Sequence, residues 1–138
     1  MGCDIHIHAE VKIAGAWHYY GEVECDRDYE LFEKIAGVRG GVADAIAEPR
    51  GVPDDATFMT RLHEAQKPED WHTKTWLTAS EIEAVAEWDR QRYAARGCGK
   101  VLPWRGYLFG NLFEYFIRCP DDYPPELEDL RFVIWFDN

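Results

Sequence analysis

The segment from Met1 to Ile13, MGCDIHIHAEVKI, decides the fold, because it alternates apolar and polar side chains with the two-residue period of a β-strand. One face of this strand carries the apolar residues Ile5, Ile7, Ala9, Val11 and Ile13. The other face carries the ionisable residues Asp4, His6, His8 and Glu10. We therefore predict a strand with one face in a core, whereas the other face is either a solvated surface or the floor of a site.

Two further segments have the composition of strands. The aromatic and β-branched residues that follow Gly15 predict an antiparallel hairpin over residues 4–24. The segment LRFVIWFDN, residues 130–138, predicts a closing strand. Pairing of the two ends of the chain in one sheet would bring Asp137 near the first strand.

Helical patterns lie between these strands. A first helix is predicted over Tyr29–Ala36 with Asp28 as its N-cap, and a second, short one over residues 56–66. The clearest helix begins after Thr78, which stands three residues before Glu81 in the spacing of a capping box, and it runs to Arg96. The segment WHTKTWLT, residues 71–78, is placed at the entrance to that helix.

The remaining segments complete the predicted organisation. Residues 40–55 predict an ordered loop, and the apolar segment YLFGNLFEYFIRC, residues 107–119, predicts a buried element of either type. The 138 residues contain no linker or repeat, so we predict a single domain, 1–138. Its predicted class is α+β, with a small mainly antiparallel sheet, formed by the N-terminal hairpin and the C-terminal strand, and helices on one face.

Composition excludes several classes of function. A formal charge of −11 disfavours binding to long nucleic acid, and no apolar run is long enough to cross a membrane. The four cysteines form no CxxC pair and no signal peptide precedes them, so we expect a cytoplasmic protein in which Cys3 is a small buried hydrophobe. The sequence contains no GxSxG, P-loop, HExxH or GxGxxG motif.

The polar face of the first strand is a candidate metal site. Asp4, His6 and His8 alternate on it, and imidazole and carboxylate ligands suit Zn²⁺, Mn²⁺ or Fe²⁺. The alternative is a solvated hairpin face. Further candidate ligands by chemistry are Glu10, His63, His72 and Asp137.

A second group of residues suits a small anionic or nucleotide-like ligand. Arg50 lies in the Pro- and Gly-containing loop PRGVP, and a rigid loop favours a bidentate grip on phosphate; the alternative is an ion pair with Asp54 or Asp55. Trp71, His72 and Trp76 combine stacking rings with a hydrogen-bond donor near a helix N-terminus. Arg27 and Tyr29 add a charge and a ring beside the first helix. For each of these the alternative is a structural role in the core or on the surface.

Five segments carry a resemblance: the start MGCDIH, RDYELFEKIAGVRG, PRGVPDD, WHTKTWLT and the ending FVIWFDN. Together they resemble a family of small uncharacterised proteins encoded by bacteriophages and prophages. The resemblance implies a phage or prophage origin and no particular activity. By analogy, small phage accessory proteins often counter host defence, including by capturing nucleotide messengers.

Three functions are consistent with these observations. The leading hypothesis is an accessory protein that binds a small phosphorylated or nucleotide-derived ligand and sequesters a host defence signal. The second is a metal-dependent phosphoesterase or other hydrolase, in which Asp4, His6 and His8 hold the cation and Glu10 or His72 is the general base. The third is an acidic protein that blocks the surface of a host protein.

Overall fold

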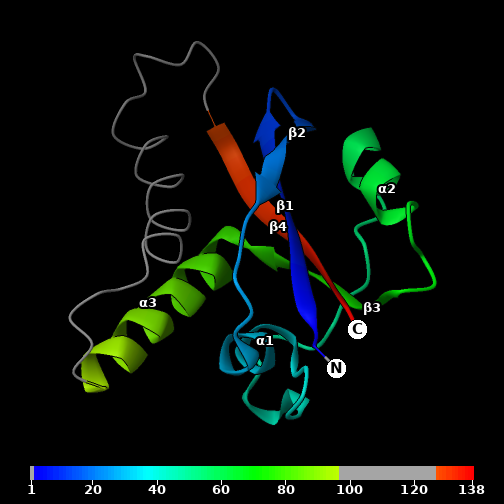
Figure 1. Ribbon diagram of the computed structural model, residues 1–138. Coiled ribbons are helices and arrows are strands. Elements are labelled where there is room, and N and C mark those ends of the chain that lie inside the picture. Colours follow the sequence, from blue (N-terminus) through cyan, green and yellow to red (C-terminus); the bar gives the residue numbers. More distant parts are fainter. Residues whose placement is uncertain (1, 97–126) are drawn as a thin grey trace.

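The computed structural model describes residues 2–96 and 127–138, so the predicted apolar element at 107–119 lies outside the described residues. The elements are β1 (Asp4–Ile13), β2 (Ala16–Val23), α1 (Tyr29–Ala36), the 3-10 turn η1 (Val42–Asp44), α2 (Phe58–Glu64), β3 (Trp71–Thr78), α3 (Ala79–Ala95) and β4 (Leu127–Asp137). In the described part of the chain the strands form one antiparallel sheet in the order β2-β1-β4-β3 (Figure 1). The predicted α+β class with a small antiparallel sheet is confirmed.

The N-terminal hairpin follows from its turn chemistry. Ala14 and Gly15 have φ values of 51° and 78°, and positive φ at both central residues is what a type I′ hairpin turn requires. The closing strand β4 lies on the other side of β1, with Asp4 opposite Asp137, so the predicted approach of Asp137 to the first strand is confirmed.

The segment WHTKTWLT differs from its prediction, because it forms the edge strand β3 rather than a helix entrance alone. Its pairing with β4 shifts register between His72 and Thr75, and Thr73 there has a φ of 52°. The extra residue is a β-bulge, which turns Trp71 and Trp76 to one side of the sheet and His72 and Thr75 to the other. Thr78 still caps α3 through the predicted capping box with Glu81.

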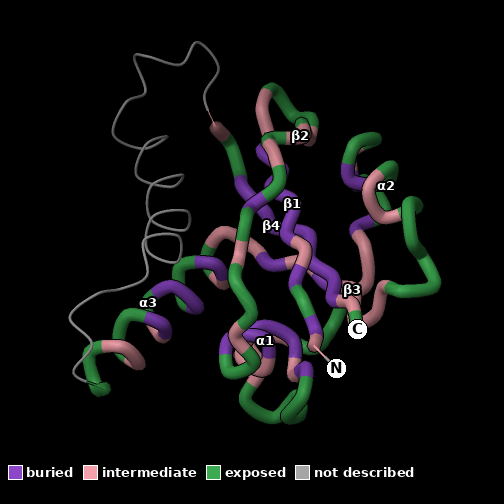
Figure 2. Tube along the Cα trace, in the orientation of Figure 1, coloured by how far each residue is buried: buried purple, intermediate pink, exposed green. Residues whose placement is uncertain are grey.

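One face of the sheet, called the first face here, packs against α1 and α3 (Figure 1). The aliphatic side of β1 meets the buried side chains Leu130, Phe132, Ile134 and Phe136 of β4. The helices contribute Leu31, Phe32 and Ile35 from α1 and Ile82, Val85 and Ala86 from α3. Figure 2 shows this buried layer along the strands and the inner sides of both helices. The apolar faces of the strands and of the two helices thus pack together in one core.

The opposite face, called the second face, is covered by α2 and by the loop that precedes it. Thr60 of α2 donates a hydrogen bond to Glu10 of β1 at 2.8 Å, and the ring of His63 lies 4.7 Å from that of His8. The prediction of helices on one face therefore describes α1 and α3, whereas α2 lies on the other. No described helix is long and apolar enough to cross a membrane.

Candidate functional site

A row of polar side chains crosses the second face at one end of the sheet. Asp137 of β4 lies opposite Asp4 of β1 on one side and opposite Trp71 of β3 on the other. Residues directly opposite each other in antiparallel strands project from the same face, so the three side chains are neighbours. His6, two residues after Asp4, is diagonal to Asp137 on that face.

His6 and Asp137 form a close pair. Nε2 of His6 lies 2.7 Å from Oδ2 of Asp137, and the backbone N–H of Asp4 donates to Oδ1 of Asp137 at 3.2 Å. Burial acts to raise the pKa of Asp137, but the hydrogen bonds from His6 and from the Asp4 N–H outweigh it, and the pKa lies below its ordinary value. Asp137 is therefore an ionised and oriented partner for the imidazole.

Asp4 is occupied by Arg27. The guanidinium Nε and Nη2 donate to the two carboxylate oxygens of Asp4 at 2.9 and 3.0 Å. Gly2 leaves room for this arrangement, since a Cβ on Gly2 would lie 2.1 Å from Nη1 of Arg27. The pair is about half exposed, so the charge of Arg27 remains accessible from solvent.

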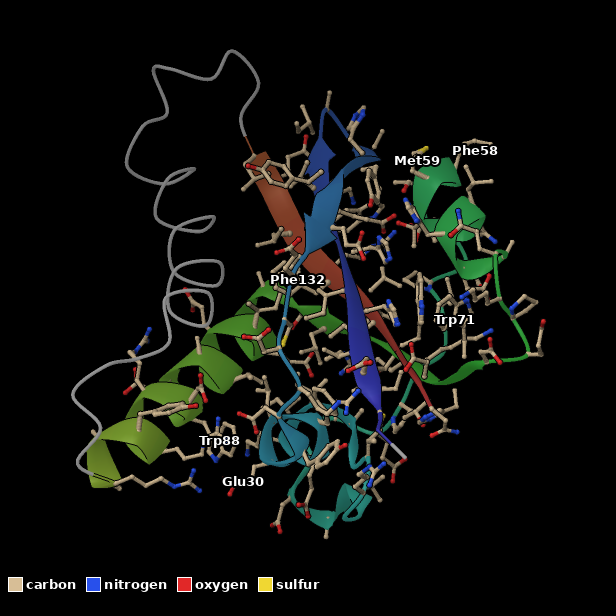
Figure 3. The ribbon with its side chains drawn as sticks, viewed as in Figure 1. Glu30, Phe58, Met59, Trp71, Trp88 and Phe132 are labelled. Atoms are coloured by element: carbon tan, nitrogen blue, oxygen red, sulfur yellow. The ribbon has the colours of Figure 1, made fainter. Side chains whose placement is uncertain are left out.

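Trp71 supplies an aromatic wall. Its indole N–H donates to the carbonyl of Glu64 at the end of α2 at 2.7 Å, and its ring lies 4.6 Å from the His6 ring and 5.8 Å from the Trp135 ring. Figure 3 shows Trp71 between the lower end of α2 and the sheet. The hydrogen bond fixes the indole plane, and because the ring is only half-buried, part of it remains exposed.

These groups line an open pocket of about 500 Å³, called the end pocket here. Its lining consists of Gly2, Asp4, His6, Arg27, Lys67, Asp70, Trp71, Asp137 and Asn138. Lys67 and Asp70 come from the turn between α2 and β3, where the Asp70 N–H donates to the Lys67 carbonyl at 3.0 Å. Within the described residues, neither side chain has a hydrogen-bond or ion-pair partner. The charged groups of Lys67 and Asp70 are therefore available to contact a ligand in the pocket.

Sequence reasoning missed Lys67, Asp70 and Asn138 as lining residues. The one signal for the first two was the turn-forming segment KPED, residues 67–70, immediately before Trp71. Asp137 was a candidate ligand by chemistry, and its place in the pocket follows from strand pairing.

The predicted metal site is corrected by this geometry. Among residues 2–96 and 127–138, no three His, Cys, Asp or Glu side chains are grouped so that they could hold a metal ion. Asp4 faces Arg27, His6 faces Asp137, and Nδ1 of His8 lies 2.9 Å from the hydroxyl of Tyr19. Alternate residues of a strand stand about 6.5 to 7 Å apart, and separate partners hold these three away from a common centre.

His8 is buried deeper on the second face. Its ring centroid lies 4.7 Å from that of Trp135 in a stacked arrangement and 4.7 Å from that of His63 in a tilted one. Burial, together with the neighbouring imidazoles of His63 and His6, lowers the pKa of His8 to about 4. His8 is therefore neutral at pH 7 and lies outside the lining of the end pocket.

Glu10, predicted as a ligand or general base, is fully buried in a structural cluster. It accepts from Arg131 Nε at 2.8 Å and from the N–H of Thr57 at 2.7 Å, in addition to Thr60. Burial acts to raise the pKa of Glu10, but these hydrogen bonds hold it below its ordinary value. Arg131 also donates to Asp55 at 2.8 Å. This cluster ties the start of α2 to the sheet.

Arg50 and Trp76 lie together, but away from the end pocket. Arg50 donates to both carboxylate oxygens of Glu81 at 2.6 and 2.7 Å and to the Trp76 carbonyl at 2.8 Å, and its guanidinium stacks 4.9 Å from the Trp76 ring. The N–H of Gly51 donates to the Lys74 carbonyl at 2.8 Å. The PRGVP loop thus covers part of the β3 edge, and Arg50 pairs with Glu81 rather than with Asp54 or Asp55.

Tyr29 and His72 contact Cys3 near the same end of the sheet. The Cys3 N–H donates to the Tyr29 hydroxyl at 3.4 Å, and Nε2 of His72 lies 3.9 Å from the Cys3 sulfur. His72 also stacks on Phe136, a residue of the first face, at 6.1 Å. Of the six predicted ligand-binding residues, only Arg27 and Trp71 line the end pocket.

Comparison of the chain with protein-family models, with curated proteins and with solved structures finds no match. The site is therefore interpreted from its own geometry.

Proposed function

We propose that the protein binds a small phosphorylated, nucleotide-derived ligand in the end pocket. One observation carries this proposal: the pocket places the rings of Trp71 and His6 in the same cavity as the cations Arg27 and Lys67. A nucleotide needs both, because its base stacks on an aromatic face and its phosphate pairs with guanidinium or ammonium.

The charges of the pocket favour an anion of low charge. The carboxylate of Asp4 is paired with Arg27, and that of Asp137 is paired with His6, whereas Lys67 has no described partner. One free cation and one shared cation suit a single phosphate group, while Asp70 supplies an acceptor for the amino group of a base or a ribose hydroxyl. In this arrangement Arg27 and Lys67 hold the phosphate and Trp71 stacks on the base.

The biological setting of the proposal comes from the sequence resemblance. A phage or prophage accessory protein in the cytoplasm of a bacterial host would encounter nucleotide messengers of host defence, and capture of one would suppress the signal. The ligand would then be bound and released intact unless the pocket also carries chemistry.

The first experiment combines a native mass spectrum of the purified protein with calorimetric titration. The probes are the 3′,5′-cyclic and 2′,3′-cyclic monophosphates of the four common ribonucleosides. Trp71→Leu is expected to weaken binding about 5- to 150-fold, since stacking contributes about 1–3 kcal/mol per base. Lys67→Gln is expected to weaken it about tenfold through the lost charge.

Matched controls exist in the chain. Trp76→Leu removes an indole and Arg50→Gln removes a cationic side chain outside the pocket, and both should leave affinity unchanged. The proposal is wrong if no probe binds, or if Trp76→Leu weakens binding as much as Trp71→Leu and Arg50→Gln as much as Lys67→Gln. Absence of binding by every probe would favour the acidic surface-blocking function instead.

A further inference from the structure

The His6–Asp137 pair has the arrangement of a general base and its positioning residue. Asp137 is a carboxylate and only accepts hydrogen bonds, so the proton of a neutral His6 ring lies on Nε2 and Nδ1 carries the free lone pair. Nδ1 has no hydrogen-bond partner among the described residues. His6 can therefore accept a proton at Nδ1 while Asp137 stabilises the resulting imidazolium.

The location of the pair also fits catalysis. Side-chain exposure is 27% for His6 and 25% for Asp137, so both reach the end pocket while water access is limited. The Asp4 N–H fixes the Asp137 carboxylate, and the Trp71 ring at 4.6 Å limits movement of the imidazole. The Glu10–Arg131 ion pair on the same face is, by contrast, buried. The His6–Asp137 pair instead faces the cavity.

We propose that the end pocket hydrolyses a phosphodiester, with His6 as the general base and Asp137 as its positioning residue; this rests on the proposed nucleotide binding. His6 Nδ1 takes a proton from a water molecule as the water oxygen forms a bond to phosphorus. The bond between phosphorus and the leaving ester oxygen breaks, that oxygen takes a proton from solvent water, and the imidazolium returns its proton to the solvent. The products are a phosphate monoester and an alcohol, with no oxidant or reductant required.

The charge of the pocket selects the diester. Three carboxylates, those of Asp4, Asp70 and Asp137, line it beside the two cations Arg27 and Lys67. A phosphodiester carries one negative charge, whereas a phosphate monoester approaches two at pH 7 and would be repelled more strongly. Lys67 and Arg27 stabilise the charge that builds on the phosphoryl oxygens during attack. The monoester product should leave readily for the same reason.

The test measures turnover of the cyclic nucleotides used for titration and of bis(4-nitrophenyl) phosphate, with the full chain and EDTA present. We expect slow hydrolysis that falls about 10²–10⁴-fold in His6→Ala and is partly restored by added imidazole. Asp137→Asn should lower kcat with little change in KM, because it disturbs the tautomer of His6 rather than the phosphate contacts. His18→Ala, an exposed histidine of β2 outside the pocket, is the matched control.

The outcomes separate the two proposals. Binding of a cyclic nucleotide without release of any monoester or nitrophenol would overturn the hydrolytic role and leave the binding function standing. Turnover that survives His6→Ala, or that imidazole fails to restore in a folded His6→Ala protein, would also overturn it. If calorimetry detects no binding and no probe turns over, both proposals are wrong. Circular dichroism of each variant checks that the fold is retained.

Discussion

The two faces of the sheet are built from the same strands by different chemistry. On the first face, buried side chains such as Ile7 and Phe132 pack against α1 and α3 and need no polar partner. On the second face, Glu10 and Arg131 are equally buried, and each polar atom that they bring under α2 has a hydrogen-bond partner or a ring. Burial on the first face is stabilising by itself, whereas burial on the second face depends on matched partners.

The second face also differs along its own length. Under α2 and its preceding loop, Glu10 and Arg131 are paired with each other and with the segment that precedes α2. At the end of the sheet the cover stops, and His6, Trp71 and Lys67 face a cavity. The same alternating strand thus supplies a structural cluster at one end and a candidate site at the other.

The largest expected effect is on the first face. Phe132 is fully buried, so Phe132→Ala should lower the free energy of unfolding by about 4 kcal/mol, through lost apolar burial and the cavity left behind. Urea unfolding at pH 7 and pH 5 measures it, and the loss should be the same at both. A loss below about 1 kcal/mol would contradict the packing described.

A somewhat smaller loss is expected for Arg131→Leu. The substitution leaves the Glu10 carboxylate buried without its cation, but Thr57 and Thr60 still donate to it, so we expect a loss of about 3 kcal/mol. Adding Glu10→Gln to Arg131→Leu should recover part of this loss, because the uncompensated charge is gone. If the single and double variants lose the same free energy of unfolding, the uncompensated charge of Glu10 is not the cause of the loss.

The third effect appears as a dependence on pH. The pKa of His8 is about 4 in the folded protein, mainly because of burial, and 6.5 is its ordinary value. As the pH falls below 6.5, the unfolded chain takes up a proton that the folded chain does not, so stability is lost. Between pH 7 and pH 5 the loss from this group is about 2 kcal/mol.

His8→Phe should remove this slope, whereas His18→Phe, which changes an exposed histidine, should keep it. The readout is the difference in unfolding free energy between the two pH values, so any constant cost of losing the Tyr19 contact cancels. If the unfolding free energy of His8→Phe depends on pH as that of the unmodified protein does, a group other than His8 causes the acid sensitivity.

The smallest effect is expected at the edge of β3. Arg50 holds Glu81 with two hydrogen bonds, but the pair is partly exposed, so Arg50→Gln should cost about 0.5 kcal/mol of stability. Ligand affinity in the end pocket should stay the same. Thermal unfolding measures the stability and calorimetry measures the affinity. A loss of affinity would show that Arg50 takes part in ligand binding, as the sequence predicted.

Local sequence signals predicted most of the elements. The alternation from Asp4 to Ile13, the turn at Gly15 and the capping box at Thr78 each depend on a few neighbouring residues, and each is present in the structure. The strand β3 was missed because its evidence is pairing with β4, about sixty residues away along the chain. A bulge at Thr73, which no local pattern announced, then decided where Trp71 and His72 point.

The candidate site was predicted in part for the same reason. Asp4 and His6 lie on the polar face of β1, as predicted, and two of the predicted ligand-binding residues, Arg27 and Trp71, line the end pocket. Arg50 was chosen for its rigid loop, but its partner Glu81 comes from the start of α3, thirty-one residues later. Ion pairing between distant segments has no periodicity that a single sequence displays.

The sequence by itself determined which side of β1 is apolar, because side chains alternate strictly along an extended backbone. It also determined where the first hairpin turns and where α3 begins, since these depend on positive φ and on a local cap. Only the tertiary structure decided which polar residues of the second face are buried and which are exposed to the end pocket. That division follows from where α2 and its loop end above the sheet, so Glu10 is bound within the fold while His6 faces the end pocket.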